Sequence, residues 1–421
     1  MPLPVLMPAS PALPSTRGSD FAPLLRDIRA AGLLERRTST YAKVIAINVA
    51  LLAATWTGVV ILRNSWWVLL LAVPLGILYT RAAFFAHDAG HQQIAGTRRL
   101  HDRLARAYCL LLGMSYDWWN DKHNRHHANP NHTDKDPDVG GVLAFTLERA
   151  QGRTGLHGWL TRNQARLFFP LLTLEGFHLK YSGVRFLLGR PRREARLELG
   201  LIALHLVLYF GALFLLMSPG RALLFALIHH MVFGVHLGSV FAPNHKGMEM
   251  PDDDTEWGYI EKQVLTSRNV NGGPITDYLM GGLNYQIEHH LFPNMPRANL
   301  RLAQPIVRQH CERIGLPYLS TGLVDSYRIG LRHLHDASSE LRFTKSAAGG
   351  PSITNMVLRF LIAEVAWRSA PSESVGSPST SIRGGQELSA WPPMLPGRAN
   401  SPATPTTSPP ALPPTELTAI R

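Results

Sequence analysis

Histidine carries most of the chemical information in this sequence, because seven of its 19 histidines fall in three short clusters. The clusters are His87-Asp-Ala-Gly-His91, His123-Asn-Arg-His126-His127 and Gln286-Ile-Glu-His289-His290. Residues three or four positions apart share one face of an α-helix, so each cluster would present two or three ligating side chains along one stripe. Neutral imidazole binds iron, copper, zinc and nickel, whereas calcium and magnesium prefer oxygen. The spacing therefore predicts metal binding.

The number of clustered histidines indicates how many ions are bound. Seven imidazoles exceed what one metal ion usually takes, so the clusters predict two ions. A histidine-rich set with few carboxylates suits redox-active iron better than hydrolytic zinc. An isolated histidine such as His205 is interpreted as a packed or hydrogen-bonded residue rather than a ligand.

Four apolar stretches must position these clusters, at residues 44–62, 66–85, 197–217 and 222–241. Each has about 20 residues, which at 1.5 Å per residue spans the roughly 30 Å hydrocarbon core of a bilayer. Very short turns at residues 63–65 and 218–221 join them in pairs, and Trp66 and Trp67 stand where an interfacial aromatic anchor is expected. The first cluster directly follows the second stretch, and the third follows the fourth stretch by about 45 residues.

The distribution of charge indicates the orientation. The formal net charge is +12, and arginine and lysine gather on the approaches to the spans, as at residues 36–43, 98–106 and 190–196, while each short turn holds one arginine. By the positive-inside rule the large segments face the cytoplasm. We therefore expect an all-α integral membrane protein with four transmembrane helices in two hairpins and a cytoplasmic helical cap that holds the metal site.

Composition divides the chain into three parts. Residues 1–42 form a cytoplasmic N-terminal segment whose proline-rich start does not resemble a signal peptide. Residues 43–340 form the membrane domain. Residues 341–421 are rich in proline, serine and threonine, and such a composition predicts a disordered tail.

The three clusters in this order, with two spans between the second and third, resemble the membrane fatty acid desaturase family over residues 40 to 335. The segments Ala128–Asp138 and Asn244–Gly247 are similar to that family as well. Gln286, where other branches carry histidine, resembles the front-end and linoleoyl-CoA-type branch and related actinobacterial acyl-CoA desaturases. The resemblance implies a bacterial plasma-membrane enzyme with two iron ions and O2 as co-substrate.

The family pattern also implies which residues bind the irons. Catalytic ligands would be His87, His91, His123, His126, His127, His289 and His290. The family uses a further histidine at the inner end of the fourth span, and we expect His245 there, with His236 as the other candidate. Gln286 departs from an all-histidine set, so it would ligate weakly, act through water or only orient a neighbour. Asp88 and Glu288 are expected to hold imidazoles as hydrogen-bond acceptors. The acidic residues 134, 136 and 138 are equally well interpreted as such acceptors or as solvated charges.

The implied reaction introduces a cis double bond into a long acyl chain, carried by coenzyme A or linked to lipid. The chain has no Gly-x-Gly-x-x-Gly loop, no His-Pro-Gly-Gly haem motif and only two cysteines, so we expect electrons from a separate ferredoxin or flavoprotein reductase. The basic face suits an acidic carrier or coenzyme A phosphates, or only sets topology. Membrane lipid is an expected partner and nucleic acid is not. Two alternatives remain: a sister di-iron hydroxylase of lipids, carotenoids or alkanes, and a histidine-rich metal transporter.

Overall fold

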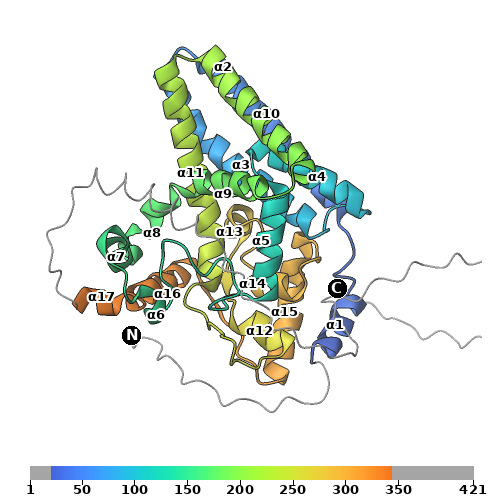
Figure 1. Ribbon diagram of the computed structural model, residues 1–421. Helices are drawn as coiled ribbons and strands as arrows, with labels where there is room; N and C mark the ends of the chain where they lie inside the picture. Colours follow the sequence, from blue (N-terminus) through green and yellow to red (C-terminus); the bar gives the residue numbers. More distant parts are fainter. Residues whose placement is uncertain (1–19, 344–421) are drawn as a thin grey trace, which may run out of the picture. The chain divides into compact units, whose positions relative to one another are not determined.

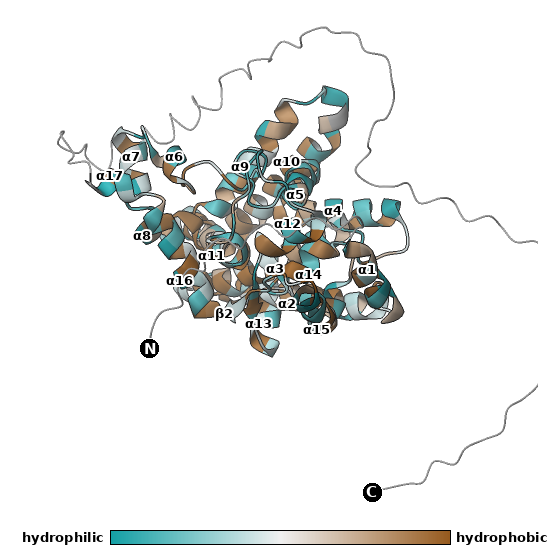
Figure 2. Ribbon diagram, turned by 90° about the horizontal axis from the view of Figure 1, so that it is seen from below, coloured by the Kyte–Doolittle hydropathy of each residue, from teal (hydrophilic) through white to brown (hydrophobic). Residues whose placement is uncertain are grey.

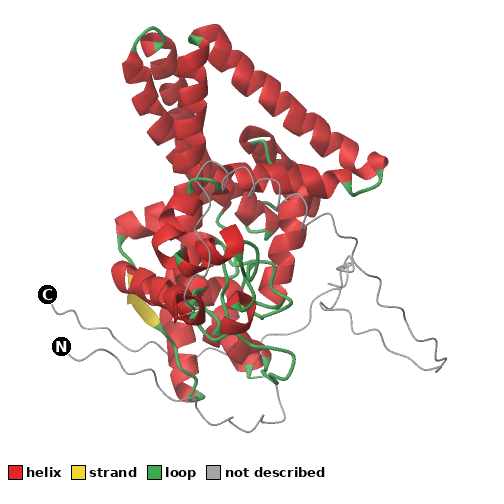
Figure 3. Cartoon of the chain, turned by 60° about the vertical axis from the view of Figure 1, so that its left-hand side comes forward, coloured by secondary structure: helices red, strands yellow, loops and turns green. Residues whose placement is uncertain are grey.

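The computed structural model describes residues 20–343, and this part of the chain is mostly helical (Figure 1). Of the expected disordered tail, only residues 341–343 are described. In the described part the only strands are β1 (Asn269–Asn271) and β2 (Ser320–Gly322), a short parallel pair in which Asn271 is opposite Gly322 (Figure 3).

Four helical stretches within the described residues are long and apolar enough to cross a membrane, as the sequence predicts. They are Thr38–Leu62 (α2), Trp66–Gly90 (the 3-10 helix η1, Trp66–Leu71, and α3, Ala72–Gly90), Ala195–Leu216 within α10 (Arg192–Leu216), and Pro219–His245 (α11). Two of these stretches continue past their expected ends, to Gly90 and His245. At 1.5 Å per residue the 27 residues of α11 measure about 40 Å, so α11 is longer than the bilayer core is thick.

The second and fourth spans pack closely against each other. Gly76 of α3 makes this possible, because a Cβ atom there would lie 2.8 Å from the side chain of Val232 on α11. Small residues permit such close approach of helices in membranes. Phe84, Phe225 and Phe233 are fully buried in the core around this contact. In contrast, Leu215 is 89% exposed and Ile61 is 74% exposed, as expected for side chains that face lipid.

The remaining described helices lie outside the four long apolar stretches. They are α1 (Phe21–Ala30), α4 (Arg98–Leu112), α5 (Tyr116–Ala128), α6 (Leu147–Ala150), α7 (Gly155–Arg162), α8 (Gln164–Leu172), α9 (Glu175–Leu188), α12 (Tyr259–Leu265), α13 (Pro274–Leu279), α14 (Gln286–Leu291), α15 (Arg297–Arg313), α16 (Leu323–Asp336) and α17 (Ser339–Phe343). A second core, around Ile28, Ile287, Leu300 and Val307, joins α1, α14 and α15. Figure 2 shows that these helices carry both hydrophilic and hydrophobic residues.

Local signals place α5, which carries the second histidine cluster. Gly113 ends α4 in the left-handed conformation, at a φ of 64°, which glycine adopts without strain. Ser115 then begins α5 by accepting a hydrogen bond from the Trp118 amide, and it donates to Glu198 on α10 at 2.6 Å. The helix ends at Ala128, two residues before Pro130, which lacks the N–H that a continuing helix needs.

Candidate metal centre

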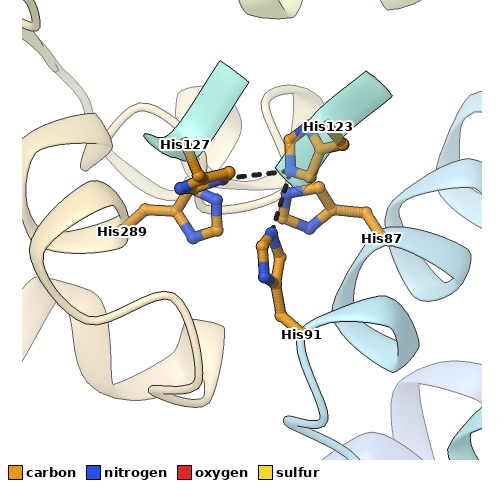
Figure 4. Close-up of side chains that lie close together, drawn as sticks. All are labelled: His87, His91, His123, His127 and His289. Atoms are coloured by element: carbon orange, nitrogen blue, oxygen red, sulfur yellow. Dashed lines mark hydrogen bonds between the residues drawn. The ribbon is translucent and has the colours of Figure 1, made fainter. Parts of the chain in front are cut away.

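The structure gathers the eight histidines expected as ligands into two adjacent groups. Group A consists of His87, His91, His123, His127 and His289 (Figure 4). Group B consists of His126, His245 and His290. In each group, one ring nitrogen from every residue lies within 4.8 Å of the others. These residues come from the ends of α3 and α11 and from α5 and α14, so the extensions of the two long spans beyond the expected limits carry ligands.

Two of the three clusters contribute to both groups. His123 and His127, four residues apart on α5, point into group A, whereas His126 points into group B. Likewise His289 lies in group A and His290 in group B. The expectation of one stripe per cluster is therefore too simple. Successive residues turn by about 100° around a helix, so positions i+3 and i+4 fall on opposite sides of position i and face different groups.

The nitrogens of group A converge closely. His123 Nε2 lies 2.9 Å from His91 Nε2 and 3.0 Å from His127 Nε2 (Figure 4). Two imidazole nitrogens that bind one ion at about 2.1 Å, at a right angle, are about 3 Å apart. The separations in group A therefore fit a shared metal ion.

Buried nitrogens without a hydrogen bond give an independent test of the fit. His87 Nε2, His127 Nδ1, His290 Nε2 and both ring nitrogens of His289 are buried and have no partner among residues 20–343. Leaving such a group unsatisfied costs about 1–3 kcal/mol. Metal ions would satisfy His87 Nε2, His290 Nε2 and one ring nitrogen of His289, whereas the unpartnered ring nitrogens of His157, His229, His236 and His310 lie outside both groups.

Hydrogen bonds from the far side of the rings fix which nitrogen faces each group. The pairs are His87 Nδ1 with Asp88 Oδ1 (3.1 Å), His126 Nδ1 with Asp136 Oδ2 (2.9 Å), His245 Nδ1 with the Thr266 carbonyl (3.0 Å) and His290 Nδ1 with Gln263 Oε1 (3.0 Å). In each pair Nδ1 donates, so Nε2 keeps its lone pair for a metal.

The electrostatics favour neutral rings. Burial, reinforced by neighbouring imidazoles, holds the pKa of His123, His127 and His289 well below the usual value, so these rings are neutral at pH 7 and can donate their lone pairs. His126 differs. Burial also lowers its pKa, but the Asp136 carboxylate outweighs burial, and the net effect is a raised pKa.

Asp88 is placed as the sequence suggests, beside His87. Its other oxygen accepts from the Tyr41 hydroxyl at 2.8 Å and forms an ion pair with Arg297. Asp136 likewise supports His126, whereas Asp134 pairs with Arg149 near the surface. Of the two interpretations given for these residues, Asp136 has the position of a hydrogen-bond acceptor for an imidazole. Asp134 has that of a charged residue near the surface.

Glu288 does not have the expected place. Its carboxylate accepts from Asn269 Nδ2 and from the Tyr318 hydroxyl, both at 2.7 Å, and makes no hydrogen bond to an imidazole of the described residues. Glu288 follows Ile287 on α14, where its side chain turns away from both groups and anchors the helix to β1. Burial raises its pKa to about 7.

The two remaining candidates differ in their distance from the centre. His236 lies outside both groups and donates from Nε2 to the Leu279 carbonyl at 2.9 Å. Gln286 lies at the edge of group B, with Nε2 3.0 Å from His245 Nε2. Its Oε1 accepts from Asn244 Nδ2 at 3.2 Å.

Sequence patterns missed several supporting residues. Gln263 and Thr266 belong to α12 and the turn after it, and nothing in their spacing links them to a histidine cluster. Asn131 donates its backbone N–H to Asp136 and its side-chain amide to the His245 carbonyl, at 2.7 and 2.8 Å. Trp119 stacks on His123 with ring centroids 4.5 Å apart. Only Asn131 and Trp119 carried a signal, because they lie in or beside the second cluster.

Comparison with known proteins agrees with this geometry. Residues 64–322 match the sequence profile described as fatty acid desaturase, and the chain belongs to this family. It is 29% identical to the Delta(6)-fatty-acid desaturase fat-3 of Caenorhabditis elegans, covering 66% of each chain. It is 31% identical to Fatty acid desaturase 3 of Bos taurus, covering 76% of this chain and 75% of the relative. The Acyl-lipid (9-3)-desaturase of Physcomitrium patens is 29% identical over 76% of this chain, which spans 64% of that relative's length.

Proposed function

We propose that this chain is an oxygen-dependent desaturase that introduces a cis double bond into a long fatty acyl chain carried by coenzyme A. The observation that carries the proposal is the pair of histidine groups at the ends of two apolar spans, α3 and α11, in a chain of the fatty acid desaturase family. His87 and His245 lie at the ends of α3 and α11, so an acyl chain bound beside these ends would reach the histidine groups.

The donor set suits two iron ions. Group A would hold one through five imidazoles, and group B the other through three imidazoles with Gln286 at its edge. When bound, the irons supply the activation of dioxygen and the removal of hydrogen from two adjacent methylenes. The overall reaction takes two hydrogens from the substrate, two electrons from a carrier and two protons from water, and it releases an alkene and two water molecules.

The protein's own residues contribute orientation. Asp88, Asp136 and Gln263 hold three imidazoles in fixed tautomers, so the ligands need little reorganisation when metal binds. Phe241, whose ring centroid lies 6.4 Å from that of His87, and Trp119 place apolar surface beside the centre. Fixed ligands and an apolar surface would hold one pair of substrate carbons beside the metals and keep bulk water away from them.

Topology and electron supply complete the proposal. The four spans would form two hairpins in a bacterial plasma membrane, with both termini and the histidine groups on the cytoplasmic side, where the basic residues gather. Electrons would come from a ferredoxin or a flavoprotein reductase. The front-end, linoleoyl-CoA-like branch suits Gln286 in the third cluster.

Product analysis tests the proposal. The chain is expressed with a ferredoxin and its reductase in a host of known fatty acid content, and acyl methyl esters are analysed by mass spectrometry. We expect a new acyl product that lacks two hydrogens, no such product from His127→Ala, and an unchanged product from His178→Ala, a control histidine outside both groups. A hydroxylated product would instead identify the sister hydroxylase, and an unchanged acyl profile with active carrier would contradict desaturation.

A further inference from the structure

The short helix α13 has its polar and apolar faces reversed relative to a helix on a water-soluble surface. Its exposed side chains are Ile275 (76% exposed), Tyr278 (45%) and Leu279 (41%), at positions i, i+3 and i+4 on one face. Its carboxylate, Asp277, turns inward and accepts a hydrogen bond from Asn284 Nδ2 at 2.9 Å. A helix whose only charged side chain is half-buried and hydrogen-bonded while its apolar stripe is exposed is suited to an apolar environment.

The neighbouring α16 extends this apolar surface. Strands β1 and β2 are parallel, so the chain leaves both at the same end of the pair, β1 toward α13 and β2 directly into α16. The first two residues of α16, Leu323 and Val324, are 38% and 62% exposed. Figure 2 shows α13, β2 and α16 along one edge of the domain. We call the five side chains Ile275, Tyr278, Leu279, Leu323 and Val324 the α13 patch.

The attachment of α13 places the patch at a definite height along the spans. The Arg81 guanidinium of α3 donates to the Tyr278 carbonyl and lies over the Tyr278 ring, 4.1 Å from its centroid. His236 of α11 donates to the Leu279 carbonyl at 2.9 Å. Behind α13, Gly281 packs flush on Phe84 of α3, where a Cβ would lie 2.3 Å from the ring. Thus α13 is fixed to both long spans before their ends, beside the lower part of α11 in Figure 1.

This height corresponds to the edge of the bilayer core. His236 is 17 residues from Pro219, the first residue of α11, which corresponds to about 25 Å along the helix, within the roughly 30 Å hydrocarbon core. His245 in group B is nine residues further, or about 13 Å beyond His236. The α13 patch therefore lies where hydrocarbon meets the headgroups, while the histidine groups lie outside the core.

We propose that the α13 patch is a membrane-docking surface, inserted among lipids at the boundary between hydrocarbon and headgroups on the side of the membrane where the histidine groups lie. The occupant is lipid, because α13 is held by Arg81 and His236, which lie within two helical stretches long and apolar enough to cross a membrane. Tyr278 is the residue type enriched at this boundary, and its backbone anchors the Arg81 charge away from lipid. This inference does not depend on the reaction at the metal centre.

Site-directed labelling tests the proposal without reference to activity. The native cysteines, Cys109 and Cys311, are both buried, so Ile275→Cys and Val324→Cys each supply one accessible thiol. Arg328→Cys is the matched control, because Arg328 lies one helical turn beyond Val324 and its side chain is 75% exposed. Each variant is placed as a single chain in a lipid nanodisc and reacted with a charged, water-soluble maleimide.

We expect Ile275→Cys and Val324→Cys to react about tenfold more slowly than Arg328→Cys, because the reactive thiolate is excluded from the apolar bilayer edge. All three should react alike after unfolding in detergent. Equal rates in the nanodisc would overturn the proposal.

Brominated lipids identify what covers the patch. A bimane attached through I275C should be quenched by lipids brominated near the headgroup end of the acyl chain, whereas one attached through R328C should not. Protection from maleimide without quenching by bromolipid would mean that protein covers the patch, and would also overturn the proposal.

Discussion

Gln286 has the same helical position relative to group B that His123 has relative to group A. It precedes His290 by four residues on α14, as His123 precedes His127 by four on α5, and in each pair both residues lie at the same group. Yet Asn244 donates to Gln286 Oε1, so the amide N–H of Gln286 points toward His245 Nε2 and competes with a metal for that lone pair. We therefore expect Gln286 to position His245 rather than to serve as a strong ligand.

The expected magnitude follows from that hydrogen bond. A neutral hydrogen bond contributes about 1 kcal/mol, and about 1.4 kcal/mol corresponds to tenfold in affinity, so Gln286→Ala should change iron affinity at group B by less than about tenfold. His290→Ala removes one of the three imidazoles of group B and should lower its iron affinity more than about a hundredfold. That loss is larger than the one expected when a residue that only supports a ligand is removed. Gln286→His should retain iron, because it adds an imidazole, and should reduce turnover, because the ring cannot keep the amide's two hydrogen bonds.

Iron content by mass spectrometry, combined with chelator competition, measures these differences. Gln164→Ala is the matched control, since Gln164 is fully buried and donates hydrogen bonds to the carbonyls of Ala144 and Leu334, none of which belongs to either histidine group. It should lower stability without selective loss of iron. If Gln286→Ala loses as much iron as His290→Ala, the amide is a ligand and our reasoning is wrong. Unchanged turnover for both Gln286 variants would remove the side chain from the site altogether.

Further predictions concern support, electrons, the tail and pH. Asp136→Asn should weaken iron binding by about 10–100-fold in chelator competition, because His126 loses its anionic acceptor, while Asp134→Asn should not. The purified chain with O2 and a nicotinamide cofactor alone should be inactive, and an added ferredoxin and reductase should restore product; activity without a carrier would reveal an internal redox site. Removal of residues 350–421 should leave membrane insertion, iron and activity intact, since their composition cannot bury a core; loss of any of these would contradict this. In the folded, metal-free chain the pKa is lowered for five of the six grouped histidines that lie outside the four spans, so the unfolded chain binds more protons near and below pH 6.5. The raised pKa values of His126 and Glu288 act in the opposite direction but are fewer. The melting temperature should therefore fall between pH 7 and pH 5.5, and a melting temperature that rises on acidification would refute the assignment of neutral rings.

Much of the centre was predictable because it depends on local periodicity. Helical spacing identifies the clustered histidines, and apolar length identifies the spans. His245 was favoured over His236 from its position at the end of the fourth span, and the structure places it in group B. The ends of α3 and α11 were underestimated, since polar residues such as His87 end an apolar run without ending the helix.

The rest depends on how separate segments meet, which spacing does not encode. Glu288 sits inside a histidine cluster, yet its direction is set by the docking of α14 on β1 and by Tyr318, 30 residues away. Gln263 of α12 and Thr266, the residue after it, support ligands only because that helix packs beside α14. The α13 patch is not found by a search for long apolar stretches, because a helix of six residues is far too short to span a membrane.

The division of neighbouring histidines between the two groups has a consequence for how the centre can change. His126 and His127, and again His289 and His290, are consecutive residues, so the distance between the two groups is set by the peptide bond and the helical turn at two places. Inserting one residue before either pair would rotate its ligands by about 100° and misdirect nitrogens in both groups at once. A change in backbone length within α5 or α14 therefore affects both groups together, whereas a change before His87 or before His245 would affect one group alone.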